Sequence, residues 1–223
     1  MSAPQWAWES ARRFWAEAGG WSRDADLEAA IDRVVSSVRV DGLAGLSTSR
    51  VRDHLARRGY STPEVVPDRR LRGCVLTLDG AGWIVLDADD PADERRFSLA
   101  HELAHLLRHH LASLEYRGDA GRRLRGVLRG VRSLHYLHLM ERGDGFLLPE
   151  VREAEEEADW LAVELLAPEE ELSPRLPPDA TRDEIAAVLR EAFGLPKSAA
   201  SAHADRLVPE VGECPLIARL KKY

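Results

Sequence analysis

The segment FSLAHELAHLLRHH, residues 97–110, constrains the fold more than any other part of this 223-residue chain. It places His101 and His105 four positions apart, with Glu102 directly after the first histidine. Because an α-helix advances by about 100° per residue, side chains four positions apart lie on one face, one turn from each other. The pattern predicts a helix from about Glu94 to His110 on which two imidazoles point to the same place.

The pattern HExxH also predicts a division of chemical roles. Two imidazole nitrogens suit a zinc ion, which favours nitrogen ligands and has no rigid geometric demand. Glu102 lies one step round the helix, where its carboxylate can reach a water beside the metal. We therefore expect His101 and His105 to bind metal and Glu102 to act as the catalytic base. The alternative is an ordinary amphipathic helix that happens to carry two of the chain's eight histidines.

A third ligand is expected, because two histidines do not hold a catalytic zinc ion. The segment EAEEEADWLAVELLAP, residues 153–168, has an apolar stripe that predicts a helix from about 150 to 166, closed by Pro168. Glu155 and Asp159 share one face of it. Glu155 would bind the metal, and Asp159 would accept a hydrogen bond from the outer nitrogen of a ligating histidine. Rival ligands are Glu156, Glu157 and, in another register, Glu164. The acidic run could also be a solvated face.

Together the two segments resemble the ImmA/IrrE-type metallopeptidases of bacteria and their mobile elements. The likeness covers about residues 40–170, with a looser echo in FGLPKSAASAHADRL. The resemblance implies a zincin-like fold and a gluzincin-like ligand set, in which a downstream Glu joins the two histidines of HExxH. It also implies cleavage of a helix-turn-helix repressor in a stress or element-induction response. Asp159 stands where the family frequently has Asn, and Ala167 where Met is common. The separation between His105 and Glu155 is longer than expected for this family, which points to an Arg-rich insertion at 117–148.

The remaining periodicities predict an α+β fold. Helical patterns cover residues 4–18, 25–39 and 46–60, and a helical stripe follows Leu124, Val127, Leu128, Val131 and Leu134. Two β-branched runs, 74–78 and 83–87, suggest a hairpin. We expect a mostly helical zincin-like metallopeptidase domain with a small antiparallel sheet and a helix-turn-helix-like C-terminal segment. The predicted division is a helical segment at 1–60, a catalytic domain at 61–172 and a helical segment at 179–223.

The working hypothesis is zinc-dependent peptide hydrolysis. The metal, held by His101, His105 and Glu155, would lower the pKa of a water towards about 7, and Glu102 would take its proton. Mn²⁺ could also be held by this ligand set. A further group should stabilise the oxyanion. The candidates are Tyr116, His135, Tyr136 and His138, each of which is more commonly a structural residue.

Composition argues against several other classes of function. The net charge of −7 disfavours general nucleic-acid binding. Direct DNA binding is therefore not expected, although Arg122, Arg123, Arg125, Arg129 and Arg132 could meet phosphates. Two distant cysteines, the absence of a signal-like N-terminus and the absence of a long apolar run together predict a cytoplasmic protein without a membrane span. A zinc-blocking role for Cys214 has little support. The alternative function is a non-catalytic, metal-containing regulatory module that acts on a partner protein or DNA.

Overall fold

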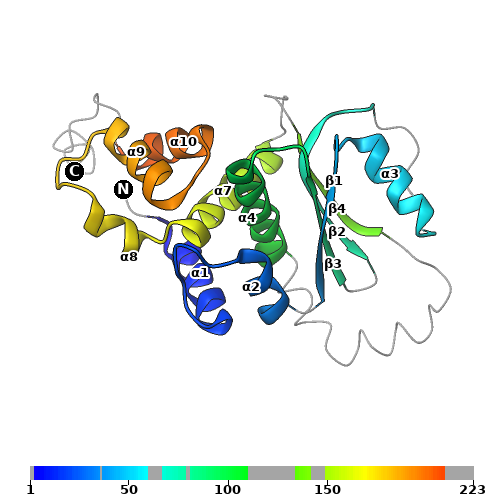
Figure 1. Ribbon diagram of the computed structural model, residues 1–223, viewed down its shortest axis with the longest axis horizontal. Coiled ribbons are helices and arrows are strands. Elements are labelled where there is room, and N and C mark those ends of the chain that lie inside the picture. The colour runs from blue at the N-terminus through cyan, green and yellow to red at the C-terminus, as the bar shows by residue number, and fades with distance from the viewer. Residues whose placement is uncertain are drawn as a thin grey trace, which may run out of the picture.

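The computed structural model describes residues 3–35, 37–59, 67–78, 81–109, 134–141 and 149–208. The helices are α1 (Gln5–Ala18), α2 (Leu27–Val34), α3 (Thr48–Arg57), α4 (Ala92–His109), α7 (Pro149–Leu166), α8 (Glu169–Leu172), α9 (Arg182–Phe193) and α10 (Lys197–Leu207), with a 3₁₀ turn η1 (Ser173–Arg175). The strands are β1 (Val38–Leu43), β2 (Leu71–Leu78), β3 (Ala81–Asp87) and β4 (Leu134–Glu141). Figure 1 shows their arrangement. The expected mixture of many helices with a small sheet is confirmed.

The strands form one mixed sheet in the order β1-β3-β2-β4. The expected hairpin is present, because β2 and β3 pair antiparallel, and β4 pairs antiparallel with the other side of β2. The expectation of a purely antiparallel sheet is wrong, since β1 runs parallel to β3. Val38, Arg39 and Val40 alternate between sheet faces as a strand requires, and the helix predicted over 25–39 therefore ends at Val34.

A second correction concerns residues 134–141. The sequence pattern predicts that the helical stripe continues to Leu134, but residues 134–141 form strand β4. The segment LHYLHLME fits both periods, because apolar residues stand at spacings of two and of three. Pairing with the exposed side of β2 decides in favour of the strand, since the backbone groups of β2 otherwise lack a partner there. The rest of the predicted stripe lies outside the described residues.

Both faces of the sheet are covered by helices, as Figure 1 shows. Val75, Ile84 and Leu86 belong to the large core that includes the buried side of α4. Cys74, Trp83 and neighbouring side chains of the opposite face pack with Val51 and Leu55 of α3 in a smaller core. This alternation along β2 and β3 fixes which sheet face meets α4, and so fixes the face towards which the HExxH motif points.

Helix α7 packs beside α4 and holds the second part of the motif. Its buried stripe contains Ala158, Leu161, Ala162 and Leu165. On its other side lies α1, whose buried Trp15 donates a hydrogen bond from Nε1 to the Leu165 carbonyl at 3.0 Å. Helices α4 and α1 thus hold α7 from two sides.

The C-terminal pair α9 and α10 packs beyond α7 (Figure 1). A capping box between Thr181 and Glu184 begins α9, and Gly194, with φ of 67°, ends it. The expected helix, tight turn and helix are present here, whereas the likeness to a DNA-binding helix-turn-helix and the predicted domain division stay predictions. Among the described residues, no helix is long and apolar enough to cross a membrane.

Candidate metal centre

His101 and His105 lie on the buried face of α4, only 2% and 0% exposed. Their Nε2 atoms are 3.1 Å apart, so the two imidazoles converge as the spacing of four residues predicts. Leu103 and Ala104 between them are uncharged and fully buried, so this part of the helix packs into the core. The convergence is a direct consequence of helical geometry at a buried face.

Glu155 of α7 completes the predicted set of three. Its Oε2 atom lies 3.2 Å from His101 Nε2, and its Oε1 atom lies 3.7 Å from His105 Nε2. These three donor groups come from two helices that are far apart in the sequence and packed side by side in the fold. The structure thus places Glu155 where the sequence analysis expects it.

Asp159 lies one turn further along α7, behind His101. The Nδ1 atom of His101 donates a hydrogen bond to Asp159 Oδ1 at 3.0 Å, which leaves Nε2 directed towards Glu155. A carboxylate in this position fixes the tautomer and the ring orientation of a metal-binding histidine. The other oxygen, Oδ2, accepts a bond from Arg206 of α10 at 2.8 Å, a contact that the sequence analysis does not anticipate.

His138 of β4 is also part of this cluster. Its Nδ1 atom donates to Glu102 Oε2 at 3.0 Å, and its Nε2 atom donates to Glu155 Oε1 at 2.5 Å. Its ring centroid is 3.7 Å from that of His105. From the sequence, His138 is expected only as one of several candidate oxyanion stabilisers. The signal that could have placed it here is the two-residue alternation in LHYLHLME, which is typical of a strand.

One donor atom from each of His101, His105, His138 and Glu155 lies within 4.8 Å of the others. Ligands of a tetrahedral zinc ion with bonds of about 2.1 Å are separated by about 3.4 Å. The distances of 3.1, 3.2 and 3.7 Å among His101, His105 and Glu155 fit that value. The 2.5 Å separation of His138 from Glu155 is instead that of a short hydrogen bond. Three donors therefore fit an ion as they stand, and the fourth lies beside them.

The charges of the cluster also fit a cation. Burial disfavours a charged His101, but the carboxylates of Asp159 and Glu155 outweigh it and raise the pKa of His101 to about 10. Burial likewise opposes a charged His138, and Glu102 and Glu155 raise its pKa to about 9. Burial would raise the pKa of Glu155, but its histidine partners hold that pKa well below its ordinary value. Protons on His101 and His138 thus neutralise the negative charge of the carboxylates. A divalent ion bound in the cluster could neutralise the same charge.

Glu102 is fully buried beside these four side chains. Its Oε2 atom accepts the bond from His138, whereas Oε1 has no hydrogen-bond partner among the described residues. A buried carboxylate oxygen without a hydrogen-bond donor destabilises the folded protein, unless a bound molecule donates a hydrogen bond to it. Gly73 of β2 passes close by, and a Cβ atom there would lie 3.2 Å from Glu102 Oε1. The strand leaves room for Glu102 because residue 73 has no side chain.

The structure does not bring the rival acidic residues of α7 into the cluster. Glu157 forms an ion pair with Arg108 at 2.8 Å, and Glu156 is exposed. Glu164 is buried further along the helix, where it accepts a bond from the Glu169 backbone. Tyr116, Cys214, the side chains of His135 and Tyr136, and the five arginines of 122–132 lie outside the described residues.

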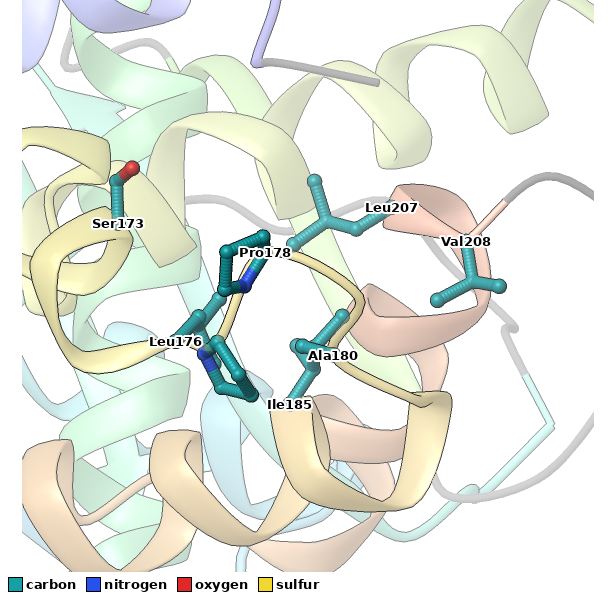
Figure 2. A pocket seen from close by; sticks show the side chains of 8 residues that line it. Ser173, Leu176, Pro178, Ala180, Ile185, Leu207 and Val208 are labelled. Carbon is teal, nitrogen blue, oxygen red and sulfur yellow. The ribbon is translucent and has the colours of Figure 1, made fainter.

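A separate hollow of about 390 Å³ lies where the linker after α8 passes the end of α10. Figure 2 shows its apolar lining, which includes Leu176, Pro178, Ile185 and Leu207. It contains no histidine or carboxylate, so its chemistry does not suit a metal ion. The candidate centre is the cluster between α4, α7 and β4.

Comparison with known protein families supports this assignment. Residues 63–125 match the family model described as the IrrE N-terminal-like domain, Peptidase_M78. The matched segment contains the whole of HExxH and ends before His138 and Glu155. A search of curated proteins gives no significant match. The match covers the HExxH motif and supports the resemblance of this segment to the ImmA/IrrE-type metallopeptidases.

Proposed function

We propose that this protein is a zinc-dependent endopeptidase. His101, His105 and Glu155 would hold the metal, and Glu102 would act as general base. The observation that carries the proposal is the convergence of the three donor groups, with separations of 3.1 to 3.7 Å, beside a buried carboxylate oxygen that has no protein partner among the described residues. Manganese remains the alternative ion for this ligand set.

The chain's own residues have separable tasks in this proposal. A bound zinc ion supplies Lewis acidity, which polarises a peptide carbonyl and acidifies adjacent water. Glu102 accepts a proton on the free Oε1 atom and delivers it to the leaving amine. His138 holds the other carboxylate oxygen and so fixes the direction of Glu102. Asp159 keeps the His101 ring in the orientation that directs Nε2 to the metal.

The substrate we propose is a helix-turn-helix repressor, cleaved in a stress or element-induction response. The family-model match over the HExxH segment supports the peptidase class. Strand β4 supports a polypeptide substrate, because it is the outermost strand of the sheet as described and carries His138 at the metal centre. An extended peptide could pair with such a strand. Since a bacterial repressor acts on the chromosome, cleavage would take place in the cytoplasm.

Glu102→Gln tests the assignment directly. The variant should bind one zinc per chain but lose cleavage of two probes, fluorescent casein and the helix-turn-helix protein encoded nearest to this gene. Glu153→Gln, an exposed change of the same charge on α7, is the matched control and should cleave normally. Loss of zinc from Glu102→Gln would show that Glu102 is a ligand. Unchanged cleavage would refute its role as base.

A second candidate function is favoured by the position of His138. If its Nε2 atom becomes a fourth ligand, the ion has four protein donors, which is typical of structural sites that leave no place for water. The protein would then be a metal-containing regulatory module. His138→Ala separates the two functions. In a peptidase it should retain zinc and reduce turnover, whereas in a closed site it should reduce zinc affinity by orders of magnitude, with no cleavage by either form.

A further inference from the structure

Helix α10 contacts the candidate metal centre through the side chain of Arg206. The Arg206 guanidinium donates to Asp159 Oδ2 at 2.8 Å and lies 5.6 Å from the centre of the Trp160 ring. Only 25% of the Arg206 side chain is exposed. An ion pair in such a partly buried site, with a second contact to an aromatic face, is better held than one on an open surface.

The two oxygens of Asp159 have different partners. Oδ1 accepts the bond from His101, and Oδ2 accepts the bond from Arg206. A carboxylate that is held by one bond can rotate about its last side-chain torsion, whereas a carboxylate held at both oxygens has its plane fixed. The orientation of the His101 ring therefore depends on Arg206 as well as on Asp159.

Arg206 is presented by a helix that is itself firmly packed. Ala199, Ala200 and Ala204 of α10 are buried, and the buried His203 ring lies 5.0 Å from Trp160 on α7. These contacts place α10 across the outer face of α7, one turn from Glu155. The guanidinium thus comes from the last turn of a helix that is packed into the core.

We propose that Arg206 is a positioning residue of the metal centre and that the C-terminal helix pair is an integral part of it. The inference rests on the proposed metal site and deepens it. Arg206 holds Asp159, Asp159 holds His101, and the affinity for the metal depends on all three. Residues 182–207 lie outside the family match at 63–125, so a centre that spans both regions makes the C-terminal pair more than an appendage.

The test is zinc affinity, measured on the full-length protein by competition with a chromophoric chelator. Arg206→Gln should weaken zinc binding by about tenfold, the lower end of the range for residues that orient metal ligands. Arg206→Lys should recover part of the affinity. The matched control is Arg182→Gln, which removes an exposed ion pair with Asp205 between α9 and α10 and does not touch Asp159. It should bind zinc as the wild type does.

A double-mutant cycle with Asp159→Asn separates positioning from general destabilisation. Once Asp159 no longer offers a carboxylate oxygen to Arg206, Arg206→Gln should cause no further loss of zinc affinity. An equal loss in both backgrounds would overturn the inference, as would unchanged affinity in Arg206→Gln. Failure of the wild type to bind zinc would instead refute the proposed function, and the two failures are therefore distinguishable.

Discussion

Glu164 should make the stability of the protein depend on pH near neutrality. Its side chain is buried on α7, and the residue is only 2% exposed. The Glu169 backbone donates one hydrogen bond to it at 3.3 Å. Burial, with repulsion from Glu169 and Glu170, raises the pKa of Glu164 to about 7 from an ordinary 4.5.

The magnitude follows from linkage between proton binding and folding. Below pH 4.5 the carboxyl is protonated in both folded and unfolded chains, so the stability that it contributes is complete. As pH rises towards 7, the unfolded chain loses its proton first, and folding becomes less favourable. With pKa values of about 7 and 4.5, the loss between pH 5 and pH 8 is about 2.5 kcal/mol.

Glu164→Gln removes this titration while keeping size and hydrogen-bonding capacity. The free energy of unfolding, measured by urea titration with zinc removed, should therefore fall less between pH 5 and pH 8 in the variant, by about 2 kcal/mol. Glu153→Gln, on the exposed part of the same helix, should show the pH dependence of the wild type. Parallel stability curves for Glu164→Gln and the wild type would refute the reasoning.

Three further outcomes are expected. Gly73→Ala should slow casein cleavage by about ten- to a hundredfold with zinc still bound, because its Cβ displaces Glu102, whereas Gly42→Ala, which meets only ordinary contacts, should not. Removal of zinc by a chelator should lower Tm by several degrees in both wild type and Glu102→Gln, since binding stabilises the folded chain by about 4 kcal/mol when free zinc is about 1,000 times Kd. Trp15→Phe should cost about 1–3 kcal/mol of unfolding free energy in chemical denaturation, because the Leu165 carbonyl loses its buried partner.

Helical periodicity is the reason that most of the candidate site could be predicted from the sequence. His101, His105, Glu155 and Asp159 all lie within long helices with clear apolar stripes, and such stripes fix which residues share a face. When two helices pack through their apolar stripes, the polar residues that flank those stripes lie opposite each other. The observed distances confirm that Glu155 and Asp159 meet His101.

The parts that could not be predicted depend on contacts between distant segments. The β-branched or apolar residues of the parallel strand β1 and of the edge strand β4 fit a helical period as well as a strand period. Only pairing with β3 and β2 decides between them. His138 was therefore assigned little weight, although it contacts both Glu102 and Glu155. Arg206 gave no signal, because one arginine in an ordinary helix has many uses.

The contact between Arg206 and Asp159 also accounts for a departure from the family pattern. An asparagine, which the family frequently has at this position, could accept the bond from His101 with its carbonyl oxygen. Its amide nitrogen would then face Arg206, and two donors would oppose each other. An aspartate offers an acceptor to each neighbour, as the distances of 3.0 and 2.8 Å show. Aspartate thus suits both neighbours, one on α4 and one on α10, and under the proposed function the HExxH helix and the C-terminal helices form one functional unit.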